Sequence, residues 1–128
     1  MEIIKLSPAH ADNRGSITDI ITDEEINAIT SITFTKGAIR ANHYHEHTIQ
    51  WNYVLYGEIL LVTQFPDDEK KSVVLKKGDL ALTREYERHA LQALSDSEVL
   101  VLTRGPRAGG NYELDTIRLD VPLIISNS

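Results

Sequence analysis

Apolar positions along the chain occur in short runs that favour β-strands. The runs are rich in β-branched residues, and most alternate apolar with polar positions, which is the period of a strand with one buried face. They cover residues 16–22, 28–35, 37–45, 52–57, 58–65, 71–76, 79–83, 89–94 and 98–103. Glycine and acidic turn signals separate them at close to the roughly 8–12-residue spacing of a sandwich or barrel. We therefore predict an all-β fold.

The remaining stretches predict loops rather than helices. Thr22 and Glu25 have capping-box spacing, but no sustained 3.6-residue apolar pattern follows them, so we expect a polar loop. Residues 105–113 are rich in glycine and predict a loop before a last extended segment, residues 114–125. No internal repeat or linker interrupts the 128 residues, which predicts a single domain, 1–128.

Composition and charge narrow the possible functions. The formal net charge of −6 and the scattered basic residues argue against a nucleic-acid surface. No apolar run approaches the roughly 20 residues of a membrane span, and the polar start lacks the blocks of a signal peptide. We expect a cytoplasmic protein without membrane contact. Because the chain has no cysteine, any metal would depend on imidazole and oxygen ligands.

Three of the five histidines, His43, His45 and His47, occupy alternate positions in one short stretch. In a strand, His43 and His45 project from the same face with Cα atoms roughly 6.5–7 Å apart, so their rings can converge on one atom. Such convergence suits a metal ion and, equally, an acid/base pair acting on one small substrate. Gln50 has the opposite parity and joins this face only if the chain turns or bulges after His45.

His89 follows a loop rich in arginine and glutamate and begins the run 89–94. If that run alternates, His89 shares a face with Leu91 and Ala93 and points to the interior. We therefore expect the rings of positions 43, 45 and 89 to meet inside the fold. The alternative is an exposed histidine strand with His89 as a hydrogen-bonded core residue, and for His47 and His10 a surface role is expected.

The spacing of these residues resembles that of the cupin superfamily. The first cupin motif is matched by Gly37, His43, His45, Gln50 and Gly57, with Gln50 in place of the usual acidic ligand. The second is matched by Gly78 and His89 only, because its usual proline, glycine and asparagine are replaced by Arg84, Tyr86 and Ala93. The resemblance implies a cupin-type double-stranded β-helix, a jelly-roll barrel whose motif histidines open into the interior and in many members hold a metal.

The segments DNRGSI (12–17), IRANHYH (39–45) and YELDTIR (112–118) resemble sugar-nucleotide cupins. These are the dTDP-sugar 3,4-ketoisomerases and, more distantly, the dTDP-4-dehydrorhamnose 3,5-epimerases. The resemblance implies that His43 is the main acid/base group, His45 the second, and that Arg40 meets the substrate's phosphates or sugar. Two departures are Ala41 in place of a glycine and the absence of a tyrosine in residues 29–33, so that a proton donor is absent or is Tyr44 or Tyr53.

Three functions follow as hypotheses. The first is an isomerase or epimerase acting on a dTDP- or UDP-sugar in polysaccharide biosynthesis, without a cofactor, with substrate contacts from Arg40, Arg14, Arg118 and Tyr53. The second is a metal cupin, a dioxygenase or metal-dependent isomerase, in which one Fe, Ni, Cu or Zn ion is bound by His43, His45, Gln50 and His89. The third is a non-catalytic barrel whose ligand stacks on Trp51, Tyr53 or Tyr56. A homodimer is expected from the resemblance to small cupins.

Overall fold

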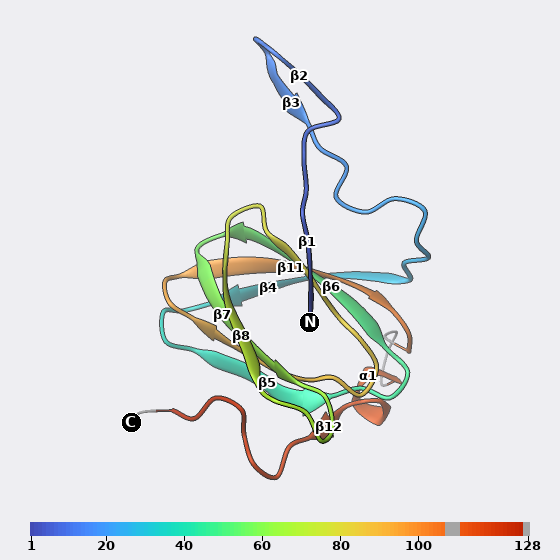
Figure 1. Ribbon diagram of the computed structural model, residues 1–128, viewed down its shortest axis with the longest axis vertical. Helices are drawn as coiled ribbons and strands as arrows, with labels where there is room; N and C mark the ends of the chain where they lie inside the picture. Colours follow the sequence, from blue (N-terminus) through green and yellow to red (C-terminus); the bar gives the residue numbers. More distant parts are fainter. Residues whose placement is uncertain (107–110, 127–128) are drawn as a thin grey trace.

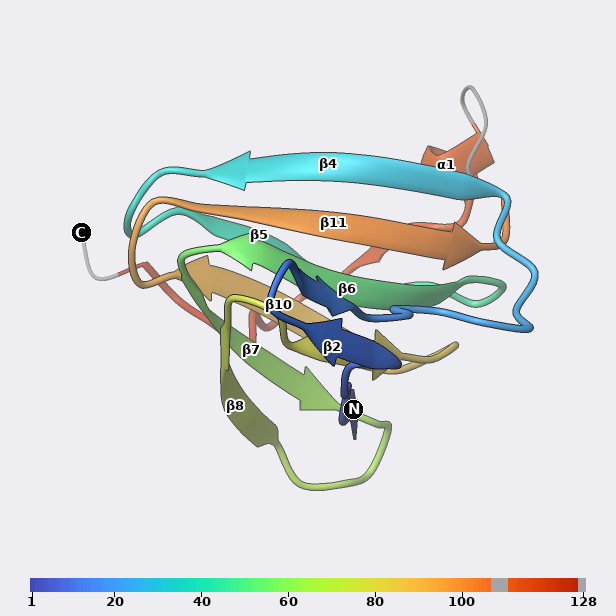
Figure 2. The same cartoon turned by 90° about the horizontal axis from the view of Figure 1, so that it is seen from above.

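Two five-stranded antiparallel sheets face each other in the computed structural model, which describes residues 1–106 and 111–126 (Figure 2). The first sheet has the order β1 (Glu2–Ile4), β9 (Leu80–Thr83), β6 (Ile49–Tyr56), β11 (Ser97–Arg104) and β4 (Ala28–Phe34). The second has the order β12 (Ile117–Arg118), β5 (Ile39–Tyr44), β10 (Arg88–Ala93), β7 (Glu58–Gln64) and β8 (Lys71–Lys76). The prediction of an all-β fold is confirmed.

A separate hairpin projects from the two sheets (Figure 1). It consists of β2 (His10–Asp12) and β3 (Gly15–Ile17), which pair with each other and whose residues are all exposed. The predicted strand 16–22 is therefore too long. After Ile17 the chain leaves its strand partner β2, and Ile20 and Ile21 instead pack against the outer face of the first sheet.

The two ends of the chain differ from expectation. Strand β1 was not predicted and pairs with β9 at the edge of the first sheet. The expected extended segment 114–125 contains only the end of helix α1 (Asn111–Leu114) and the two-residue strand β12. Residues 22–27 form the expected loop, which ends where β4 begins at Ala28. Of the expected glycine-rich loop 105–113, residues 111–113 belong to α1 instead, and residues 107–110 lie outside the described residues. Among the described residues, no helix combines the length and apolar character that a bilayer crossing requires.

Strand alternation divides the apolar residues between the two faces of the first sheet. On β6, Asn52 and Val54 face the interior, whereas Trp51 and Tyr53 face outward. The interior cluster consists of Phe34, Val54, Ile59, Leu61, Leu75, Ala81, Leu91, Ala93, Val99 and Val101. Burial of each large apolar side chain contributes about 1.5–3 kcal/mol, so this cluster supplies much of the stability of the fold.

At one end of the interior, the inward positions change from apolar to polar on neighbouring strands. In the first sheet Thr103 pairs with Gln50, and Gln50 pairs with Thr83. In the second sheet His89 pairs with both His43 and Thr63. We call these six residues the polar layer. The strand registers thus place the candidate site at one end of the barrel interior, next to the apolar cluster.

Candidate active site

Strand β5 brings His43 to the polar layer through an irregular backbone, and His45 follows directly after the strand ends at Tyr44. Ala41 and Asn42 have φ angles of 72° and 56°, and the pairing with β10 shifts register between His89 and Ala90. Such bulges re-aim side chains at the end of a strand. The ring centroids of His43 and His45 lie 4.7 Å apart, and both rings are buried.

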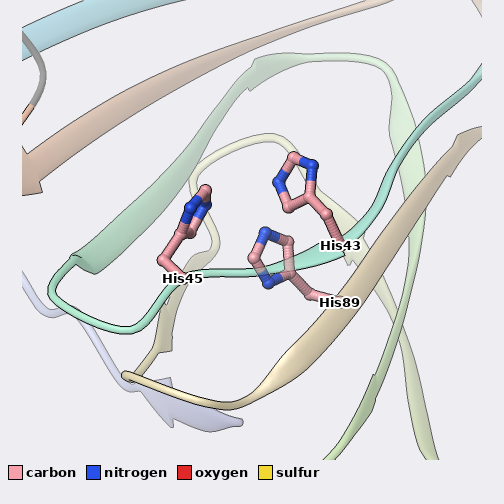
Figure 3. A group of neighbouring side chains, drawn as sticks. All are labelled: His43, His45 and His89. Atoms are coloured by element: carbon pink, nitrogen blue, oxygen red, sulfur yellow. The ribbon is translucent and has the colours of Figure 1, made fainter. Parts of the chain in front are cut away.

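His89 completes the group from β10 (Figure 3). Its ring centroid lies 4.7 Å from that of His43 and 5.3 Å from that of His45. One nitrogen from each ring lies within 4.8 Å of the other two. The prediction that the three rings meet is confirmed, and we call them the histidine cluster.

Main-chain carbonyl groups determine the proton position on two of the rings. Nδ1 of His45 lies 2.9 Å from the carbonyl oxygen of Asp115, and Nδ1 of His89 lies 3.0 Å from that of Glu87. Because a carbonyl oxygen only accepts hydrogen bonds, each Nδ1 must carry the proton and donate it. In the neutral ring the lone pair is then on Nε2. The Nδ1 atom of His43 is buried without a hydrogen-bond partner in the described part of the chain.

The cluster favours uncharged rings. Burial lowers the pKa of His43 to about 2, with further contributions from His89, His45 and Arg118. Burial also lowers the pKa of His89 to about 4, assisted by His45 and opposed by the hydrogen bond to Glu87. Removing a charge from water and placing it near other cations both disfavour the imidazolium form. Both rings are therefore neutral at neutral pH.

The cluster opens into a cavity of about 200 Å³. Its polar lining includes His43, His89, Gln50 and Asn52, while Arg40, Thr116 and Arg118 come from more exposed positions that we call the mouth. The apolar lining consists of Ile32, Phe34, Ala41, Leu91, Val99 and Val101. Among the described residues, none that lines the cavity has a carboxylate, so its two guanidinium groups favour an anionic ligand.

Five of the eight expected site residues line this cavity, namely Arg40, His43, Gln50, His89 and Arg118. His45 belongs to the histidine cluster but does not line the cavity, and neither do Arg14 and Tyr53. Arg14 lies on the projecting hairpin, where it pairs with Asp12 at 2.6 Å. Tyr53 faces outward into the second apolar cluster because it is an odd number of positions from Gln50 on the same strand. The expectation that this chain brings Arg14 and Tyr53 to its own site is therefore corrected. Tyr44, the other candidate proton donor, lies under the guanidinium of Arg88 and does not line the cavity.

Three residues at the site were missed from the sequence. Asn52 lines the cavity and donates from Nδ2 to the carbonyl oxygen of Ala81 at 3.1 Å; its parity with Gln50 was the available signal. Thr116 lines the mouth, and Asp115 holds the ring of His45. No local sequence pattern signals the last two, because their contacts are with residues far away in the chain.

The ring nitrogens of the histidine cluster meet some of the requirements of a transition-metal site. Two nitrogens bound to one ion at about 2.1 Å are at most about 4.2 Å apart, so the bound of 4.8 Å requires only small ring movements. Hydrogen bonds from Nδ1 to carbonyl groups also orient metal-binding histidines. The charges fit less well, because His43, His45, Gln50 and His89 are neutral donors and the nearby arginines repel a dication.

Comparison with known proteins identifies the family. The sequence profile of the cupin domain matches residues 30–103. The chain belongs to the cupin domain family. The predicted jelly-roll fold is thereby confirmed. A search of curated proteins found no significant sequence match.

Solved structures similar to this cupin include sugar-nucleotide enzymes, which confirms the resemblance stated from the motifs. The QdtA 3,4-ketoisomerase of Thermoanaerobacterium thermosaccharolyticum, a double mutant in complex with TDP, is 25% identical with a TM-score of 0.75, over 92% of this chain and 86% of that chain. WlaRA, a TDP-fucose-3,4-ketoisomerase of Campylobacter jejuni, is 19% identical with a TM-score of 0.76, over 91% and 87%. The rmlC epimerase of Mycobacterium tuberculosis is 19% identical with a TM-score of 0.69, over 79% and 61%.

Proposed function

We propose that this cupin is a sugar-nucleotide isomerase of the 3,4-ketoisomerase or epimerase type, with His43 as its acid/base group. The observation that carries the proposal is a cluster of buried histidines opening into a cavity whose lining contains two arginines and, among the described residues, no carboxylate. The structural similarity to a ketoisomerase in complex with TDP supports the same substrate class.

The two mouth arginines would bind the diphosphate of such a substrate. Their present contacts are weak: Arg40 reaches the carbonyl oxygen of Thr33 at 3.3 Å, and Arg118 is 4.0 Å from the carboxylate of Glu113. Both guanidinium groups can therefore turn to a phosphate and donate two parallel hydrogen bonds. The sugar would then extend toward the histidine cluster and the apolar lining.

The chemistry requires a base that is neutral before the reaction. In a 4-keto sugar, the carbonyl group acidifies the C–H bond at C3. The neutral ring of His43 takes this proton while the electron pair moves to the C4 oxygen as an enolate. A proton is then returned to C4, and the proton of the C3 hydroxyl group is transferred to the C4 oxygen. This gives the 3-keto, 4-hydroxy isomer and consumes no cofactor. The diphosphate charge raises the pKa of His43 from its low value, which strengthens it as a base.

The cavity favours ketoisomerisation over epimerisation. His43 and His89 come from the second sheet, whereas the lining from the first sheet consists of Ile32, Phe34, Gln50, Asn52, Val99 and Val101. Among the described residues, the first-sheet wall therefore offers amides and hydrocarbon but no acid. Epimerisation needs a proton donor on the face opposite the base, while one base can serve both carbons in a ketoisomerisation. His45 would assist as the second acid/base group.

The test is hydrogen exchange on a substrate. We expect that dTDP-4-keto-6-deoxyglucose incubated with the protein in D₂O incorporates deuterium next to the carbonyl and converts to the 3-keto isomer, both followed by NMR. The UDP-linked sugar serves to define the nucleotide preference. Absence of exchange and of TDP binding by calorimetry would exclude the proposal, while TDP binding without exchange would leave the non-catalytic barrel.

A metal cupin is the second candidate, favoured by the three nitrogens within 4.8 Å of one another. His43, His45 and His89 would bind the ion, with Gln50 beside them, and the ion would polarise a bound oxygen. Elemental analysis of protein purified without added metal, and titration with Fe, Ni, Cu or Zn, tests this. Stoichiometric metal that is lost in H89N, with no response to nucleotide sugars, would favour this candidate over the isomerase.

We also propose a homodimer, supported by the projecting hairpin. Residues 7–19 are exposed along their whole length, and Ile17 is 62% exposed. A two-stranded hairpin with such exposed residues gains stability when a second copy covers it. Light scattering should give twice the mass of the chain, and a variant with residues 9–18 replaced by a short glycine linker should be monomeric. A monomeric parent protein would exclude the dimer.

A further inference from the structure

Asp115 is a buried acidic residue beside the connection between β5 and β6. It lies between α1 and β12 and is only 5% exposed. A carboxylate in such a position is stable only if its oxygens accept hydrogen bonds. Its donors are the main-chain N–H groups of Glu46 and His47, at 3.1 Å, and Oγ1 of Thr48, at 2.6 Å. The side chain thus fixes the turn that immediately follows His45.

The main chain of the same residue holds the ring of His45. The carbonyl oxygen of Asp115 accepts the hydrogen bond from Nδ1, so the lone pair of the neutral ring is on Nε2. The carboxylate anchors Asp115 against the turn, and this anchoring keeps its carbonyl group in place. We propose that Asp115 is a positioning residue that sets the tautomer and orientation of His45.

The position of Asp115 in the chain extends its effect to the mouth. Thr116 and Arg118 follow it closely and line the cavity, and Arg118 pairs in register with His43. Anchoring of this segment therefore orients a cluster ring and places a guanidinium group at the same time. A residue that only closed the turn would not have this second contact with the imidazole of His45.

Ring NMR separates positioning from a purely structural role. With ¹⁵N-labelled histidine, we expect the parent protein to show His45 as the single Nδ1–H tautomer. In D115A we expect a mixture of tautomers and about tenfold faster solvent exchange of this ring proton. D115N retains one oxygen and should give a smaller change in the same direction. His89 is the internal control, because its Nδ1 is held by Glu87 and should not change.

A milder variant keeps the test decisive if D115A does not fold. T48V has nearly the same shape but removes the shortest contact to the carboxylate, and it should accelerate exchange of the His45 ring proton without changing His89. The proposal would be overturned if folded D115A kept the Nδ1–H tautomer of His45 and its ring-proton exchange rate. If D115A unfolds, the same result in T48V would overturn it.

Only the effect of Asp115 on turnover rests on the proposed function; its positioning of His45 does not. In turnover, we expect D115N to lower kcat more than it raises KM, because His45, the proposed second acid/base group, is displaced while Arg40 still binds the diphosphate. The NMR readout uses the protein without substrate. A failure of the proposed function would leave the tautomer result intact, whereas an unchanged tautomer would overturn the positioning role alone.

Discussion

His43 and His89 face each other directly across the paired strands β5 and β10, with ring centroids 4.7 Å apart and ring planes at 89°. The edge of one ring therefore meets the face of the other. This arrangement depends on the antiparallel register, because the two residues lie far apart in the chain. It also means that a proton on one ring disfavours a proton on the other.

Removal of the proposed base should abolish turnover and leave the fold nearly unchanged. In H43N we expect a loss of about 10²–10⁴-fold in kcat with dTDP-4-keto-6-deoxyglucose. Stability should change little, because the buried Nδ1 of His43 makes no hydrogen bond within the described residues that the variant would lose. Steady-state kinetics and urea denaturation measure the two effects. H47A is the control, since His47 is exposed, and it should match the parent protein.

The histidine cluster should make the fold sensitive to acid. The unfolded chain binds protons at His43 and His89 near pH 6.5, whereas the folded chain resists them until about pH 2 and pH 4. Between these values the unfolded state holds more protons, so stability falls as the pH falls. From pH 6.5 to 4.5 each ring contributes a loss of roughly 2 kcal/mol.

Urea denaturation at the two pH values checks this acid sensitivity. H43Q and H89N should each lose less stability than the parent protein on acidification, and H47Q should lose the same amount. Equal pH dependence of H43Q, H89N and the parent would show that the rings are accessible to protons in the folded state.

The mouth arginines should act on substrate binding. In R40Q and R118Q we expect KM for the nucleotide sugar to rise about tenfold or more, because each loses charged hydrogen bonds to phosphate worth about 1.5–3 kcal/mol. The change in kcat should be smaller. R84Q is a matched control, since Arg84 is exposed and pairs with Glu2 at 3.2 Å away from the cavity. An effect of R84Q equal to that of R40Q would indicate a general charge effect instead.

The turn after His45 should tolerate no side chain at Gly105. A Cβ atom there would lie 2.6 Å from Oγ1 of Thr48 and 2.7 Å from the carbonyl oxygen of His47. We expect G105A to destabilise the protein by about 1–3 kcal/mol in urea denaturation, as is typical of overpacking. Gly37 has a φ of 89°, but a Cβ atom added there would meet no other part of the described chain within 4 Å. G37A should therefore cost only the backbone strain of about 1 kcal/mol.

Asn42 should hold the last part of the chain against β5. Its Oδ1 accepts from the N–H groups of Leu123 at 2.8 Å and Ile124 at 3.2 Å, and its Nδ2 donates to the carbonyl oxygen of Ile124 at 3.1 Å. In N42A we expect amide hydrogen exchange of residues 121–126 to approach that of an unprotected chain. N42D keeps the acceptor and should give an intermediate result. Unchanged protection in N42A would show that other contacts hold this segment.

Most of the fold and much of the site could be predicted from local patterns in the sequence. Alternation located the strands and pointed His89 inward together with Leu91, and the motif spacing linked it to His43. The outward position of Tyr53 was available from the same alternation, since Gln50 and Tyr53 cannot share a face of a regular strand. The sequence therefore contained the information needed to place Tyr53 on the outer face.

The remaining differences depend on contacts between distant parts of the chain. Nothing near Arg14 indicates that β2 and β3 pair with each other and project from the barrel. Similarly, the sequence around Asp115 does not show that its carboxylate meets the turn at residues 46–48. Such placements are set by the packing of the whole fold. A local period of two or 3.6 residues carries no information about contacts between distant parts of the chain.

The boundary between the apolar cluster and the polar layer has an evolutionary consequence. Residues such as Leu61 and Val54 keep the barrel folded from one end, while any reaction would occur at the other. New specificities usually arise at the expense of stability, because active-site groups replace well-packed ones. Here the histidine cluster and the mouth arginines lie outside the apolar cluster, whereas Phe34, Leu91, Val99 and Val101 belong to it and also line the cavity. This scaffold can therefore acquire altered substrates with least loss of stability by exchanging polar residues at one end.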